Sequence, residues 1–176
     1  DDAQNKRILE AYKAYLKKLF LMTGNDEAAA EKKMQAVINI ETRIAKASYD
    51  RVKLRDIEAN YHKMTYAQLI NDFPGIDWGN VFLASGFPAF DYVDVGQPEP
   101  IHEVEKILAE ASLDDLKSYA EAKVIGGATS VLGDEFRKVS FELSSVMTGV
   151  KEDRPRWKRA VGLVHNEELF RFNLME

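Results

Sequence analysis

The sequence predicts a mainly α-helical protein: a multi-helix bundle with a long N-terminal helical hairpin and at most one or two short strands. Two observations carry this prediction. Apolar residues recur at three- and four-residue steps through most of the chain, which is the period of a helix. The alternation typical of a strand occurs convincingly only once. With 176 residues, 45% of them hydrophobic, we expect residues 1–176 to form a single helical domain.

The first two predicted helices are long and adjacent in the chain. Residues 3–22 place apolar side chains on one face, and Gly24 follows as a C-cap. Asp26 is the expected N-cap of a second helix, which runs to about Ala47. Because only a short Gly-Asn turn joins them, we expect an antiparallel helical hairpin.

Short elements follow. Residues 49–62 have weak periodicity and are expected to be a connecting segment. Thr65 to Gln68 read as a capping box that opens a helix ending before Pro74. Asp77 is the expected N-cap of another short helix. Residues 92–95 are the one convincing strand, and its partner is either a short segment elsewhere in the chain or a strand outside it.

Helices resume in the second half of the chain. We expect them over residues 100–111, after the Ser112 cap, over residues 134–148 and from about Pro155 onward. Gly126 and Gly127 are expected to break or bend the helix that Ser112 caps.

Composition excludes several classes of protein. The net charge of −5 argues against a nucleic-acid-binding domain, and the absence of cysteine removes disulfides and thiolate zinc sites. No stretch of 18 apolar residues is present, so no membrane span is predicted. The N-terminus does not resemble a signal peptide, and we read the chain as a processed or excised one.

The histidines do not form a catalytic pattern. A zinc peptidase helix needs two histidines four residues apart, because only then do both side chains reach one ion from the same face. His102 and Glu103 begin such a motif, but Lys106 stands where the second histidine is required. His62 and His165 lie in separate segments. We therefore expect solvated or partly packed histidines.

Other catalytic signals are equally weak. The carboxylate pairs Asp114/Asp115, Asp134/Glu135 and Glu167/Glu168 lie near helix starts or on exposed faces, where they complement the helix dipole. The two adjacent glycines lack the lysine and spacing of a phosphate loop. The sequence predicts no catalytic, metal-binding or cofactor-binding residue, and it identifies no substrate-binding residue.

Glu41 is unusual because it falls on the apolar face of the second helix. A buried carboxylate needs a partner, since an unpaired buried charge is very costly. The candidates are Arg55, Arg154 and Arg156. The alternative is that Glu41 lies at the edge of the apolar stripe and reaches water.

Residues 151–159, KEDRPRWKR, concentrate five cations around one tryptophan. A nucleic-acid footprint would need a wider basic surface. We instead expect the helix that starts at Pro155 to bury Trp157 in the bundle with three apolar neighbours, Ala160, Val161 and Val164. Arg154 or Arg156 would then point inward, while Lys158 and Arg159 would face solvent.

Five segments together resemble the neprilysin family of zinc metallopeptidases. They are IETRIAKAS, KLRDIEANYHKMTYAQL, FPGIDWGNVF, VGQPEPI and RPRWKRAVGLV, in the family's order and over residues 8–164. The chain has no cysteine and in this respect resembles the bacterial members of the family. The residues that we take as the structural signature of this resemblance are Glu41, Arg55, Asp56, Asp77, Trp78, Arg156 and Trp157.

The resemblance implies an internal fragment of a two-lobed peptidase. In this family a catalytic lobe carries the zinc ligands, and a helical lobe closes over the active site as a lid that restricts substrates to peptides. The present segments match the helical lobe, so zinc is expected in the parent protein and no cofactor in this chain. The implied partners are the catalytic lobe of the same polypeptide and the peptide substrates, and the implied location is periplasmic or otherwise extracytoplasmic.

After Val164 the sequence HNEELFRFNLME departs from the family pattern. The alternative function is a free-standing helical protein-interaction domain derived from the same lobe. In either case an excised lobe is expected to expose apolar surface and to have some tendency to self-associate.

Overall fold

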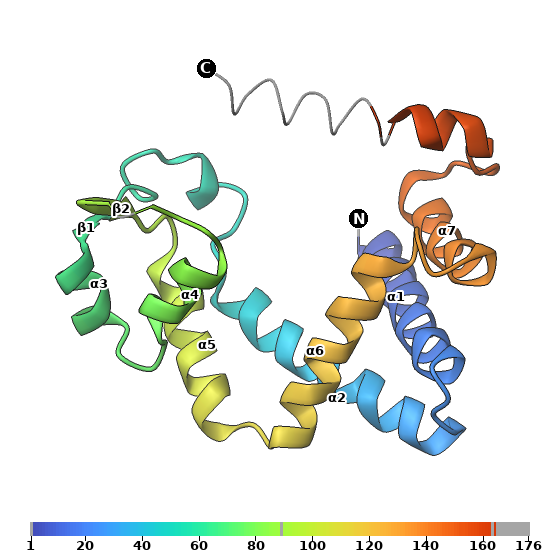
Figure 1. The fold of residues 1–176 in the computed structure, drawn as a ribbon, viewed down its shortest axis with the longest axis horizontal. Coiled ribbons are helices and arrows are strands. Elements are labelled where there is room, and N and C mark those ends of the chain that lie inside the picture. Colours follow the sequence, from blue (N-terminus) through green and yellow to red (C-terminus); the bar gives the residue numbers. More distant parts are fainter. Residues whose placement is uncertain (1, 89, 163, 165–176) are drawn as a thin grey trace. The chain divides into compact units, whose positions relative to one another are not determined.

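The computed structural model describes residues 2–88, 90–162 and 164, and the mainly helical prediction is confirmed (Figure 1). The chain packs as two compact units. Unit 1 combines residues 1–15 with residues 128–176, and unit 2 comprises Leu16–Gly127. Each unit is described by itself.

The predicted helix–turn–helix is present. α1 spans Asp2–Met22 and α2 spans Glu27–Ala47. The turn is held by Gly24, whose φ of +92° favours glycine, and by the Asp26 side chain, which accepts a hydrogen bond from a backbone N–H of the first turn of α2. In unit 2 the end of α1 and α2 supply most of the buried residues: Leu16, Leu19, Phe20, Ala30, Met34, Ala36, Val37, Ile38 and Ile40.

The predicted strand has a partner within the chain. β2, Tyr92–Asp94, pairs antiparallel with β1, Lys63–Thr65, so that Met64 lies opposite Val93. The partner is only three residues long and directly follows the connecting segment, which explains why periodicity alone did not reveal it.

Two short helices and the sheet enclose a small core of unit 2. α3, Tyr66–Asp72, begins with the predicted capping box, and α4, Trp78–Ala84, begins at the predicted N-cap. The core residues are Leu69, Phe73 and Val95. The residues packed against them are Met64, Trp78, Phe82, Val93 and Ile101. This core therefore joins elements that are each too short to be stable alone.

α5 and α6 complete unit 2. α5 spans Pro98–Glu110 and packs on α2, and α6 spans Leu113–Ala128. Of the break or bend predicted at Gly126 and Gly127, the break is wrong, because α6 continues through both glycines. Ala122 and Ile125 are buried on α6, and their packing offsets the roughly 1 kcal/mol that each glycine costs a helix.

In unit 1, α7 spans Asp134–Thr148 and ends at Gly149, whose φ is +77°. The prediction of this helix and of its C-cap is confirmed. Residues 156–162 and 164 are helical too, as predicted from Pro155. The departing sequence at 165–176, with His165 and Glu167/Glu168, lies outside the described residues.

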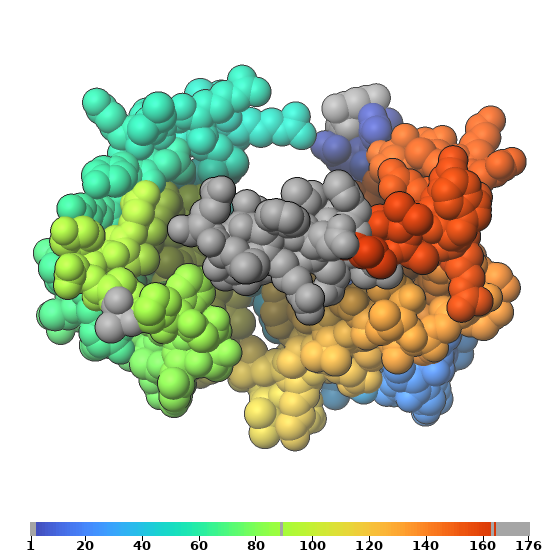
Figure 2. All heavy atoms as spheres, turned by 45° about the horizontal axis from the view of Figure 1, so that its top comes forward, coloured from blue at the N-terminus to red at the C-terminus, as the bar shows by residue number. Residues whose placement is uncertain are grey.

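The connecting segment 49–62 contains one 3-10 turn, η1, at Lys53–Arg55. Residues 51–58 of this segment are exposed, and the segment is drawn in cyan to teal in Figure 2.

Candidate functional site

Glu41 is paired, but not with a predicted partner. Its Oε1 accepts a hydrogen bond from Nζ of Lys123 on α6 at 2.5 Å. The Glu41 side chain is 25% exposed, between the buried and the solvated alternatives. Within unit 2 the prediction of Arg55 is wrong, because the position of α6 beside α2, which no local pattern encodes, brings Lys123 to the carboxylate instead.

The surroundings of Lys123 favour the protonated, positively charged form of its amine. Burial lowers the pKa of Lys123, but the hydrogen bond and the charge of Glu41, with a smaller contribution from Tyr119, outweigh burial and raise its pKa above the ordinary value. The pair therefore ties α2 to α6 as an ion pair. Because the pair joins two neighbouring helices, we assign it a structural role.

Asp56 of the signature fixes a loop. Its Oδ1 accepts from the backbone N–H of Ala59 at 3.1 Å, and its carbonyl accepts from Asn60 Nδ2 at 2.6 Å. Arg55, the last residue of η1, is exposed. The signature pair thus separates into an aspartate that shapes the backbone and an arginine that faces solvent.

Asp77 and Trp78 position α4. Asp77 accepts from the backbone N–H of Asn80 at 3.0 Å, as predicted for an N-cap. Trp78 Nε1 donates to the carbonyl of Phe73 at 3.0 Å, and its ring stacks on Phe82 with 5.9 Å between centroids. Asp77 therefore fixes the start of α4, and Trp78 packs that helix against the small core.

Trp157 is 64% exposed, so the prediction that it is buried in the bundle is wrong. The predicted neighbours Val161 and Val164 are also exposed. Arg156 is exposed as well, rather than pointing inward.

Asp153 explains this orientation. Its carboxylate pairs with Arg137 of α7 and, at 3.5 Å, with Arg159. Arg159 therefore faces inward, against the prediction, while Lys158 is exposed as expected. Positions 157 and 159 differ by roughly 200° around a helix. Turning Arg159 inward consequently turns Trp157 outward.

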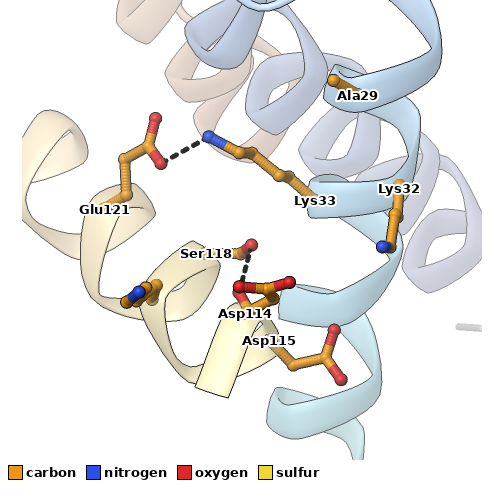
Figure 3. A pocket seen from close by; sticks show the side chains of 8 residues that line it. Ala29, Lys32, Lys33, Asp114, Asp115, Ser118 and Glu121 are labelled. Atoms are coloured by element: carbon orange, nitrogen blue, oxygen red, sulfur yellow. Dashed lines mark hydrogen bonds and ion pairs between the residues drawn. The ribbon is translucent and has the colours of Figure 1, made fainter. Parts of the chain in front are cut away.

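A pocket lined by residues of α2 and α6 has a volume of about 360 Å³ (Figure 3). Its lining residues are Ala29, Lys32, Lys33, Asp114, Asp115, Lys117, Ser118 and Glu121. Lys33 reaches Glu121 at 2.6 Å, and the Ser118 hydroxyl donates to the carbonyl of Asp114 at 2.7 Å. Three lysines thus face three carboxylates, and the one hydroxyl is already used by the helix backbone. The arrangement offers no activated nucleophile.

The described histidines are partly packed, as expected. Nδ1 of His62 lies 2.8 Å from the carbonyl oxygen of Val95, and His102 contacts Glu105 and the ring of Phe73. Across residues 2–88, 90–162 and 164, no group of three or more His, Asp or Glu side chains is arranged to hold a metal ion. No helix in the same ranges is long and apolar enough to cross a membrane.

Sequence reasoning missed the ion pairs that connect distant elements. Arg43 of α2 bridges Glu103 and Glu110 of α5 at 2.6 and 2.8 Å, and the hydrogen bond to Glu103 is the first cause that raises the pKa of Arg43. Glu103 and Glu110 lie seven residues apart on one helical face, which is the only sequence signal for a shared partner.

The comparisons with known proteins identify the family of the chain. The sequence profile described as "Peptidase family M13" matches residues 1–175. The chain belongs to peptidase family M13. The resemblance to neprilysin-like zinc metallopeptidases is therefore confirmed, and the chain corresponds to the N-terminal region of M13 peptidases.

M13 relatives include human endothelin-converting enzyme 1, which is 30% identical over 173 residues, and neprilysin-2 of Drosophila melanogaster, 23% identical over 164 residues. These alignments cover 93% and 90% of this chain but only 22% and 21% of the relatives.

Solved structures of the zinc metalloprotease Zmp1 from Mycobacterium tuberculosis match as well. In the open state the TM-score is 0.84, with 90% of this chain and 25% of Zmp1 covered. In the inhibitor complex the TM-score is 0.86, and the match covers 93% of this chain and 25% of Zmp1. Identity is 30% in both. The chain thus spans about a quarter of the M13 proteins that it matches.

Proposed function

We propose that this chain is the helical lid lobe of an M13 zinc metalloendopeptidase, which encloses the active-site chamber and restricts substrates to peptides. The observation that carries the proposal is the match of nearly the whole chain to about a quarter of Zmp1, a zinc metalloprotease with an open state. We therefore assign this fragment the role of the lobe that opens and closes the chamber.

In this proposal the remainder of the parent polypeptide holds the zinc ion and the catalytic groups. Members of the family are zinc metallopeptidases, and this chain contributes packing, shape and peptide contact. By itself it hydrolyses no peptide bond. Zinc titration of the isolated chain is expected to show no tight stoichiometric site, and metal-dependent peptide hydrolysis by the chain alone would refute the assignment.

A chimera tests the lid role directly. The segment matching this chain in Zmp1 is replaced by residues 1–176, and both proteins are assayed on quenched peptides of increasing length and on a folded protein carrying the same cleavage sequence. The size limit should change to that of this chain's own parent, while zinc content and cleavage of the shortest peptide stay unchanged. A size limit that stays with the Zmp1 catalytic part would contradict the proposal.

The parent is proposed to act in a periplasmic or otherwise extracytoplasmic location, with its catalytic part and peptides as partners. Reporter fusions to the parent that are active only outside the cytoplasm provide the test. An open reading frame ending at Glu176 would instead favour the free-standing interaction domain.

A further inference from the structure

The surface segment 50–60, which contains the Arg55–Asp56 signature, directs its polar groups toward its own backbone. Asp50 Oδ1 accepts hydrogen bonds from the backbone N–H groups of Val52 and Lys53 at 2.9 and 2.8 Å. Asp56 does the same for a residue three positions later. Asp50 therefore forms an Asx turn at the start of the segment, and Asp56 fixes its middle by a side chain to backbone hydrogen bond three residues ahead.

Asn60 locks the end of the segment onto the turn before it. Its Nδ2 donates to the carbonyls of Lys53 and Asp56 at 2.7 and 2.6 Å, and its backbone N–H donates to the Asp56 carbonyl at 3.2 Å. Three polar side chains within eleven residues thus hold one backbone conformation. A surface preorganised in this way loses little conformational entropy on binding.

Large apolar side chains of the same segment face solvent. Val52 is 80% exposed and Ile57 is 84% exposed, and Leu54 between them is 48% exposed. Single exposed apolar residues are ordinary, but three within six residues on a fixed backbone concentrate apolar surface in one short segment, and apolar patches of this kind mark interaction sites.

Cations flank this patch. Arg51 and Arg55 are exposed, and neither forms an ion pair with any residue that the structure describes. Lys53 differs, because it pairs with Glu99 of α5 at 3.2 Å. Two unpaired guanidinium groups beside an apolar patch match a partner surface that is apolar at its centre and carries carboxylates at its edge.

We infer that the patch Val52–Leu54–Ile57, with Arg51 and Arg55 at its rim, docks onto a region of the parent M13 polypeptide that lies outside these 176 residues. The relatives are about four times as long as their matched segments, so most of such a polypeptide is available to cover the patch. This inference rests on the proposed membership in a larger peptidase, and it assigns the Arg55–Asp56 signature to the contact.

Site-specific photocrosslinking in the full parent protein tests the contact. The photoreactive residue p-benzoylphenylalanine is placed at Val52, and in a matched control at Val124 of α6, which is 71% exposed. We expect intramolecular crosslinks from position 52 to an apolar segment with neighbouring carboxylates outside residues 1–176, at a yield at least about fivefold above that from position 124.

Three results would overturn the inference. Crosslinks that join two copies of the protein would assign the patch to self-association. Equal yields from the two positions would show that the patch is not distinguished from other exposed apolar surface. The absence of crosslinks from position 52, or crosslinks confined to residues 1–176, would show that nothing outside the chain covers the patch.

A charge variant provides a second measurement. Arg55→Glu in the crosslinker-bearing parent should lower the yield from position 52 at least about threefold, whereas Lys117→Glu on exposed α6 surface should not. An unchanged yield with Arg55→Glu would contradict the carboxylate rim. The crosslinks report docking whether or not the lobe limits substrate size, so the lid proposal can fail independently of this one.

Discussion

The pair formed by Glu41 and Lys123 offers the sharpest test of how α2 and α6 are held together. The two residues lie 82 positions apart in the sequence and their charged atoms are 2.5 Å apart. The perturbations are Glu41→Gln and Lys123→Met, which remove one charge each while keeping most of the side-chain volume. A double-mutant cycle isolates the interaction between them, because other contacts of each residue cancel.

The expected magnitude follows from exposure. Two unit charges 4 Å apart attract by about 4 kcal/mol at an effective dielectric constant of 20 and by about 1 kcal/mol in water. The Lys123 side chain is 52% exposed and that of Glu41 is 25% exposed, so solvent screens much of the attraction. We expect a coupling free energy of about 1 kcal/mol, at the upper end for partly exposed pairs.

The assay is urea denaturation of the four proteins in the cycle at neutral pH. The double variant should lose about 1 kcal/mol less than the sum of the two single losses, corresponding to roughly 2–4 °C in Tm. Lys138 and Glu135, 60% and 76% exposed on α7, form the control pair, with an expected coupling of about 0.3 kcal/mol. Strictly additive losses for Glu41 and Lys123 would refute the pairing.

The pH dependence has a definite sign. The pKa of Lys123 is raised in the folded protein, so its contribution is fully present below the unfolded value of 10.5 and is lost as pH rises through the folded pKa. The coupling should therefore be constant from neutral pH upward and should shrink only as pH rises above 10.5. A coupling that grows at alkaline pH would contradict this reasoning.

Three further predictions concern single residues. Trp78→Phe removes an indole hydrogen bond and should cost about 1–2 kcal/mol by urea denaturation, whereas Trp157→Phe at the exposed tryptophan should stay within about 0.5 kcal/mol. Gly127→Ala should stabilise the protein by up to about 1 kcal/mol, because no atom lies within 4 Å of the added Cβ on α6. Gly149→Ala, at a φ of +77°, should instead destabilise it by about 1 kcal/mol. Changes in Tm of the same sign for the two variants would contradict this. The pKa of Glu99 is lowered, first by the hydrogen bond from Tyr49, so the stability that the Glu99 carboxylate contributes is present above the unfolded value of 4.5 and is lost as pH falls. The difference in Tm between the wild type and Glu99→Gln should therefore close toward pH 3. A difference that stays constant would count against this prediction.

Local features of the fold were predictable because their partners lie within a few residues. The caps at Asp26, Thr65 and Asp77 each bind a backbone N–H three positions ahead, so the sequence alone specifies them. The same holds for the left-handed glycine that ends α7. The family assignment was predictable as well, since it depends on the order of short segments in the chain.

Features that depend on packing between distant segments were decided by the tertiary structure. Sequence identified Glu41 as a residue needing a partner, but only the placement of α6 supplied Lys123. Sequence identified a strand, but only the fold brought Met64 opposite Val93. Apolar character at Trp157 predicted burial, yet the ion pairs of Asp153 turned that helix the other way. Residue type determines which groups must leave water or find a partner, whereas the relative position of the helices determines which partner each one meets.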